Sequence, residues 1–219
     1  MSSPRIAFFD LDHTLLDGDS DTSFLGYLMD RISLPAEVQE RKDRIHHAYM
    51  VGEPWQTEYR ELLALIYAGQ PHGQLRQWSR SHAAECLLPM LFAGARDLIE
   101  REREQRDQLC LLTTTNQIVT EPLLAELGLD VLLSTRLEVT GERLSGSLVG
   151  DFCTGPGKAA ALLAHCEQLG ADPVDCAMFG DGRSDMQALA AVGEPVAVHP
   201  TDELREQARR LGWPILDLA

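Results

Sequence analysis

The sequence predicts an α/β protein built on a doubly wound parallel sheet, with an α-helical cap inserted after the first strand. Short apolar runs alternate with segments of helical length along most of the chain, which is typical of a parallel sheet covered by helices. Residues 17–90 break this alternation, because they are helix-like throughout. Roughly 100 residues separate Thr14 from Thr113, although a crossover between parallel strands needs only a dozen or so. We therefore expect a separate helical module in this segment.

The first strand is predicted at residues 6–10, where the apolar run Ile-Ala-Phe-Phe leads into Asp10. Such a run fits a strand that is buried on both faces. Later strands are predicted at residues 109–113, 131–135, 175–181, 194–200 and 214–218, and helices at residues 93–108, 117–128, 157–170, 184–193 and 201–212. Residues 136–150 alternate and turn around Gly141, which predicts a β-hairpin. These elements together predict a Rossmann-like core.

The helix-like segment divides at proline and glycine positions into four predicted helices. These are residues 20–31, 35–50, 54–68 and 73–87. The predicted division of the chain is therefore an α/β core, residues 1–16 and 91–219, and a helical cap, residues 17–90.

Composition restricts the class of protein. The 219 residues are 44% hydrophobic and 24% charged, as in an ordinary globular protein. A net charge of −15 argues against nonspecific binding to nucleic acid or to an anionic membrane. The chain has no apolar stretch of about 20 residues and no signal-peptide pattern at its start, so a cytoplasmic location is expected. Five cysteines without a CxxC spacing argue against a disulfide framework or a structural zinc site.

Polar side chains follow the predicted strands at the edge where open parallel sheets bind their ligands. The candidates each lie at a strand end or near a helix start: Asp10, Asp12, Thr113, Thr114, Lys158, Asp181 and Asp185. Because the carboxyl ends of parallel strands meet at one edge, we expect these groups to converge on one site.

Asp10 and Asp12 repel each other unless a cation neutralises them. In phosphoryl transfer, Asp10 can attack phosphorus to form an aspartyl-phosphate. Asp12 can protonate the leaving alcohol and then deprotonate the attacking water. A hard cation with oxygen ligands, Mg²⁺, can bridge Asp10, Asp181 and a phosphate oxygen.

The phosphate itself needs donors and positive charge on a protein of net charge −15. Thr113, with Thr114 beside it, and loop N–H groups can hold the phosphate oxygens. Lys158, after Gly155 and Gly157, can supply the missing positive charge.

Four motifs in this order, DLDHT, LLTTTN, GPGKAA and GDGRSD, resemble those of the haloacid dehalogenase superfamily, and the resemblance covers residues 5 to about 198. It implies that Asp10 is the nucleophile and Asp12 the acid and base. It also implies a metal site in which Asp181 and the backbone carbonyl of Asp12 are ligands and Asp185 acts through water. Lys158 and Thr113 bind phosphate in such a site.

Asp12 favours phosphate esters over halides, because a halide leaving group needs no acid. The helical insertion resembles the phosphoserine-phosphatase-like branch, subfamily IB, which includes histidinol-phosphate phosphatases. Phosphoserine phosphatases have a glutamate nine residues after the nucleophile that faces the substrate ammonium, and Asp19 occupies that position here, although it could also be a helix N-cap. The second motif has threonines where that branch has Ser-Gly-Gly, and no cap arginine matches its carboxylate-binding one.

The expected function is a Mg²⁺-dependent phosphoric monoester hydrolase acting on a small amino-alcohol phosphate, phosphoserine or histidinol phosphate. A compact cap is expected to leave little room beyond the phosphate. Two alternatives stay open, a phosphotransferase of the same superfamily and a non-catalytic protein that binds phosphorylated ligands. The partner is a small phosphorylated metabolite rather than nucleic acid or membrane, and the chain is expected to be a monomer or a homodimer.

Overall fold

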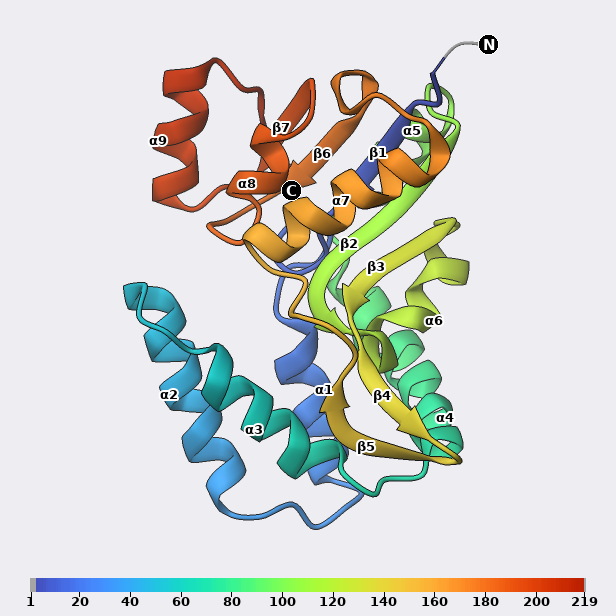
Figure 1. Ribbon diagram of the computed structural model, residues 1–219, viewed down its shortest axis with the longest axis vertical. Helices are drawn as coiled ribbons and strands as arrows, with labels where there is room; N and C mark the ends of the chain where they lie inside the picture. Colours follow the sequence, from blue (N-terminus) through green and yellow to red (C-terminus); the bar gives the residue numbers. More distant parts are fainter. Residues whose placement is uncertain (1–2, 219) are drawn as a thin grey trace.

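A six-stranded parallel sheet forms the centre of the computed structural model, which describes residues 3–218 except the side chain of Met50 (Figure 1). The strand order is β3-β2-β1-β6-β7-β8. The strands are β1 (Ile6–Phe9), β2 (Gln108–Asn116), β3 (Val131–Thr135), β6 (Ala177–Gly180), β7 (Glu194–Val198) and β8 (Ile215–Leu216). The predicted α/β fold with a doubly wound parallel sheet is confirmed.

Helices cover both faces of this sheet. They are α5 (Ala95–Arg103), α6 (Gln117–Leu127), α7 (Pro156–Leu169), α8 (Met186–Ala190) and α9 (Asp202–Leu211). Successive side chains of a strand point to opposite faces, and β1 shows this clearly. Phe9 packs in one core cluster with Leu98 of α5, whereas Phe8 packs in the other with Leu162 of α7. The sheet is therefore buried on both sides, and its carboxyl edge borders a cavity.

The segment after β1 is helical, as the sequence predicts. It consists of α1 (Ser20–Met29), α2 (Glu37–Val51), α3 (Gln56–Tyr67) and α4 (His72–His82), followed by a π-helical turn η1 (Ala83–Leu87) and a 3-10 turn η2 (Leu88–Met90). Figure 1 shows α1, α2 and α3 beyond the carboxyl edge of the sheet, whereas α4 packs beside α6 of the core. The exact division into core and cap stays a prediction. No helix in the described residues is long and apolar enough to cross a membrane.

The predicted hairpin is formed by β4 (Leu137–Thr140) and β5 (Arg143–Leu148), which pair antiparallel. It extends toward the helical insert and packs against α3 (Figure 1). The N–H of Gly69, just after α3, donates to the carbonyl of Leu144 at 2.8 Å, and the Leu144 N–H donates to Gln70 at 3.0 Å. The β4–β5 hairpin, which belongs to the predicted core, thus supports α3 of the helical insert.

The contact between β5 and α3 requires a glycine at residue 146. Gly146 has φ +87°, and a Cβ there would lie 2.8 Å from the Cβ of Ala68. We expect Gly146→Ala to lower the free energy of unfolding by more than Gly141→Ala, a matched control with φ +62° and no atom within 4 Å. Both substitutions share a backbone strain of about 1–2 kcal/mol, but only the first adds a clash. Urea unfolding of both variants measures the difference, and equal losses would refute the packing argument.

Candidate active site

The predicted site residues converge at the carboxyl edge of the sheet. Asp10 and Asp12 follow β1, Thr113 lies near the end of β2, and Asp181 follows β6. These four side chains line a cavity of about 580 Å³ between the sheet edge and the helical insert, together with Thr114 and Asp19. Lys158 and Asp185 do not line it, because both are completely buried beneath it.

Asp10 is held by a buried ion pair. The ammonium Nζ of Lys158 lies 2.7 Å from Asp10 Oδ1 and 2.6 Å from Asp185 Oδ1. The hydroxyl of Thr14 donates to Asp10 Oδ2 at 3.3 Å. Burial, and then repulsion by Asp185, raise the pKa of Asp10 to about 7 against the attraction of Lys158. Burial alone would lower the pKa of Lys158, but the two carboxylates raise it, so this lysine stays protonated. Its predicted contact with phosphate stays a prediction.

Asp12 has different partners from Asp10. Its Oδ1 accepts a hydrogen bond of 2.7 Å from the N–H of Ser20, and its Oδ2 accepts one of 2.8 Å from the hydroxyl of Thr115. Both donors are neutral. Burial, followed by repulsion from Asp19, raises the pKa of Asp12 to about 7. A carboxyl group with this pKa can give and take a proton near neutral pH.

Three carboxylates form a set that fits a hard cation. Asp10, Asp181 and Asp185 each offer an oxygen, and the three oxygens lie within 4.8 Å of one another. Burial, then repulsion by Asp185 and Asp10, raise the pKa of Asp181 to about 9. Such crowding is relieved when a cation binds, and carboxylate oxygens are the ligands that Mg²⁺ prefers.

Asp185 is occupied by protein donors, in contrast to Asp181. Its Oδ1 accepts from Lys158, and its Oδ2 accepts from the N–H groups of Asp181 at 3.1 Å and Gly182 at 3.2 Å. Gly180 makes this fold-back possible, because a Cβ there would lie 2.6 Å from the Asp185 Cβ. Direct coordination therefore suits Asp10 and Asp181, and an indirect role suits Asp185, but these metal roles stay predictions.

Thr113 is positioned to donate a hydrogen bond to an anion in the cavity. It is buried at the end of β2, and its Oγ1 accepts the N–H of Thr115 at 3.2 Å, so its own proton can be donated into the cavity. The sheet register also shifts between Thr113 and Asn116, where β2 pairs with β3. Thr114 lines the same cavity. Phosphate binding by either threonine stays a prediction.

Asp19 is the N-cap of α1. Its side chain accepts the N–H of Thr22 at 2.6 Å and is exposed, although it also lines the cavity. The helix-cap alternative is therefore present in the structure, and the predicted contact with a substrate amine stays a prediction.

The cavity is larger than the sequence suggests. The prediction that the cap leaves little room beyond a phosphate is wrong, because the cavity continues into the helical insert past Leu28, Leu63 and Ile66. The cavity lies between α1 and the pair formed by α2 and α3, and all three helices contribute lining residues.

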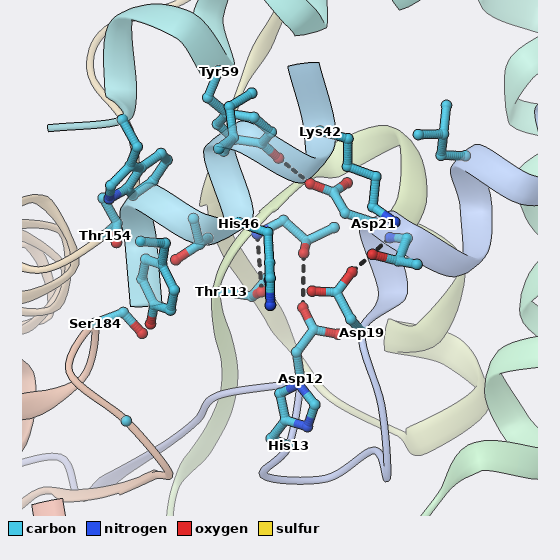
Figure 2. Close-up of a pocket in the computed structure, with 18 of the residues that line it drawn as sticks. Asp12, His13, Asp19, Asp21, Lys42, His46, Tyr59, Thr113, Thr154 and Ser184 are labelled. Carbon is cyan, nitrogen blue, oxygen red and sulfur yellow. Dashed lines mark hydrogen bonds between the residues drawn. The ribbon is translucent and has the colours of Figure 1, made fainter. Parts of the chain in front are cut away.

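Several lining residues were not predicted from sequence. Thr115 orients Asp12 through its hydroxyl group. Asp21 accepts a hydrogen bond from the hydroxyl of Tyr59 in α3 (Figure 2). Lys42 of α2 lies on the same side of the cavity. No local pattern marks Tyr59 or Lys42, because each looks like an ordinary residue of an amphipathic helix.

The sequence is similar to a hydrolase family and to curated proteins named as phosphatases. The sequence model of the haloacid dehalogenase-like hydrolase family matches residues 7–190. A curated histidinol-phosphatase of Neisseria meningitidis serogroup C is 26% identical over 97% of this chain and 98% of its own. Phosphoserine phosphatase SerB1 of Mycobacterium tuberculosis is 27% identical over 96% of this chain and 70% of its own.

Solved structures show the same architecture. A protein of unknown function from Bordetella pertussis Tohama I superposes with a TM-score of 0.89 and 30% identity, and the match covers all of both chains. A phosphoserine phosphatase solved as a phospho-aspartyl intermediate analogue has a TM-score of 0.72 and 19% identity, over all of this chain and 95% of its own. The second likeness is one of fold.

The carboxylate set predicts a pH-dependent stabilisation by Mg²⁺. Because the pKa values of Asp181 and Asp10 are raised to about 9 and about 7, protons occupy these carboxylates at low pH and compete with the cation. Mg²⁺ at a hundred times its Kd near pH 9 should add about 2.7 kcal/mol to the free energy of unfolding. That corresponds to roughly 5–10 °C in Tm.

The rise in Tm caused by Mg²⁺ should be smaller near pH 6, and Asp181→Asn should lose it. Asp97→Asn, which neutralises an exposed carboxylate of α5, should keep it. Thermal unfolding with Mg²⁺ or with EDTA measures it. A shift that ignores pH, or that survives in Asp181→Asn, would contradict the assignment.

Proposed function

The chain belongs to the haloacid dehalogenase-like hydrolase family, and on that premise we propose that it is a Mg²⁺-dependent phosphomonoesterase that works through an aspartyl-phosphate on Asp10. The observation that carries the proposal is that two neighbouring aspartates of one cavity have different hydrogen-bond partners. Asp10 pairs with the cation Lys158, whereas Asp12 is bound by neutral donors. The relatives named as phosphatases support the phosphoric monoester hydrolase class.

In the first step, a carboxylate oxygen of Asp10 forms a bond to phosphorus while the bond from phosphorus to the ester oxygen breaks. Lys158 donates to Asp10 Oδ1, and its positive charge opposes the effect of burial on the pKa of Asp10, which favours the ionised nucleophile. The leaving oxygen takes the proton of Asp12, so the product departs as a neutral alcohol.

In the second step, water attacks the phosphorus of the aspartyl-phosphate, and the bond from phosphorus to Asp10 breaks. Asp12 now takes the proton of the water, and inorganic phosphate leaves. The hydrogen bonds from Ser20 and Thr115 hold the two Asp12 oxygens in place during both transfers.

Mg²⁺ would be held by Asp10, Asp181 and the backbone carbonyl of Asp12, with Asp185 acting through water. When bound, the cation supplies charge that offsets the repulsion between these carboxylates and the phosphate oxygens. Thr113 supplies a hydroxyl donor for the phosphate and Lys158 supplies further positive charge nearby.

The proposed substrate is the phosphate ester of a small amino alcohol, histidinol phosphate or phosphoserine. The cavity beyond the phosphate end is walled by aliphatic side chains and by the aromatic rings of Trp55, Tyr59 and Tyr67. Its volume and its aromatic wall suit a ring-bearing alcohol, and the relative named histidinol-phosphatase supports histidinol phosphate as the first choice. Phosphoserine needs a partner for its carboxylate, and Lys42 is the one lysine or arginine among the described lining residues.

Phosphate release from a panel of phosphorylated metabolites tests this function. Wild-type protein with Mg²⁺ should hydrolyse histidinol phosphate or phosphoserine faster than sugar phosphates and nucleotides. Asp10→Asn should lose at least about a thousandfold in kcat, since loss of a covalent nucleophile costs orders of magnitude. Activity within about tenfold of wild type in Asp10→Asn would refute the nucleophile, and a preference for sugar phosphates would refute the substrate class alone.

The role of Asp12 predicts a dependence on the leaving group. An alkoxide needs a proton far more than p-nitrophenolate does, so Asp12→Asn should lose kcat mainly on alkyl phosphates. We expect a loss of about 10²- to 10⁴-fold there and a clearly smaller loss in formation of the aspartyl-phosphate from p-nitrophenyl phosphate, followed as the burst of p-nitrophenolate. Equal losses in the two first-step rates would show that Asp12 is not the acid.

A further inference from the structure

We propose that Asp21, rather than Asp19, binds the cationic nitrogen of the substrate, in a subsite formed with Tyr59 and Asn116. This inference deepens the proposed function and depends on it for the identity of the substrate. Figure 2 shows Asp21 beside Tyr59 and Lys42 on the cap side of the cavity, with Asp19 between it and Asp12 in this view. The subsite is thus part of the same cavity as the nucleophile.

The Asp21 carboxylate is fixed from two sides. The Tyr59 hydroxyl donates to its Oδ2, and the side-chain amide of Asn116 donates to its Oδ1 at 3.4 Å. Asn116 is itself held, because its Oδ1 accepts the N–H of Ile118 at 3.0 Å and its amide also donates to Tyr67 at 3.4 Å. All of these donors are neutral. They orient the carboxylate without supplying a positive charge.

The charges around the cavity are unbalanced. Five of the described lining residues are carboxylates: Asp10, Asp12, Asp19, Asp21 and Asp181. Lys42 is the single lysine or arginine among them, and its attraction offsets only part of the rise that burial and Asp19 cause in the pKa of Asp21. Lys158 is already engaged by Asp10 and Asp185. A metal ion at Asp10 and Asp181 would leave Asp21 as a charge that a cationic ligand can match.

Burial and the nearby Asp19 raise the pKa of Asp21 to about 7 against the hydrogen bond from Tyr59 and the attraction of Lys42. Ionisation of Asp21 is therefore unfavourable in free energy in the unliganded protein, and a bound cation would offset this free energy. Both the geometry and the electrostatics of Asp21 therefore favour a ligand that carries a positive charge.

The walls of the subsite also favour a cation attached to an apolar or planar body. The rings of Tyr59, Trp55 and Phe152 form a cluster, in which the Tyr59 centroid lies 5.5 Å from Trp55 and 5.3 Å from Phe152 and the latter two are 5.8 Å apart. Aromatic faces attract ammonium and imidazolium groups. Leu62 and Ile66 add aliphatic surface, which suits an imidazole ring and is unsuited to the many hydroxyls of a sugar.

Asp19 is less suited to this task. Its carboxylate caps α1 through Thr22 and is exposed, so water screens its charge. The two aspartates have the same charge and lie two residues apart on one helix start, which makes their asparagine variants a matched pair.

The test compares specificity ratios, kcat/KM for histidinol phosphate divided by kcat/KM for p-nitrophenyl phosphate. Asp21→Asn should lower this ratio by about 10- to 100-fold, mainly through KM, because it removes one member of a desolvated charge pair. Asp17→Asn, an exposed neutralisation outside the cavity, should leave the ratio within about threefold of wild type. A larger fall in Asp19→Asn than in Asp21→Asn, or an unchanged ratio in Asp21→Asn, would overturn the proposal.

A binding measurement separates failure of this inference from failure of the proposed function. L-histidinol carries the cationic groups without the phosphate, so its binding does not require turnover. Calorimetric titration should show that Asp21→Asn binds L-histidinol at least about tenfold more weakly than wild type and Asp17→Asn. Equal affinities in the three folded proteins would overturn the subsite even if the enzyme hydrolyses phosphate esters. A selective loss in Asp21→Asn would support it even if histidinol phosphate is not hydrolysed.

Discussion

The buried ammonium of Lys158 is the interaction on which the site depends. It contacts Asp10 at 2.7 Å and Asp185 at 2.6 Å, and so it joins the end of β1, the first turn of α7 and the loop after β6. Without it, two buried carboxylates would face each other unpaired, and breaking such a pair costs about 3–5 kcal/mol. The same contacts hold Asp10, the proposed nucleophile, and Asp185, whose carboxylate fixes the loop that carries Asp181, and they place a positive charge beside the acidic site.

One residue type serves several purposes here because each aspartate has different neighbours. Asp10 faces a lysine, Asp12 faces a backbone N–H and a hydroxyl, and Asp185 is saturated by three donors. A positive charge thus opposes the effect of burial on Asp10, whereas Asp12 is held by neutral donors and Asp185 is fixed by three hydrogen bonds. The roles proposed for these aspartates, which the sequence assigns by order along the chain, correspond to these differences in the charge and number of their hydrogen-bond donors.

Most of the fold and the core of the site could be predicted because both depend on local patterns. Apolar runs that end in aspartate or threonine marked the carboxyl ends of β1, β2 and β6, and a parallel sheet brings such ends together. Boundaries were less predictable, since β2 continues through its threonines to Asn116. The size of the cavity and the Asp21–Tyr59 contact depend on how α1 and α3 approach in space, and residues 38 apart in sequence leave no pattern for that.

In the proposed complex, the two ends of the substrate would meet different parts of the chain. The phosphate end would meet residues of the sheet edge, whereas the carboxylate of Asp21 takes one donor from α3 and one from Asn116 at the start of α6. Tyr59 also packs on Phe152, which precedes α7, so α3 is tied to the sheet edge at that point. Asp21, Tyr59 and Asn116 belong to three separate elements. The hydrogen bonds that hold the Asp21 carboxylate therefore require α1 and α3 to lie over the carboxyl edge of the sheet. The position of the helical insert therefore determines both the volume that a substrate can fill and the charge that it meets there.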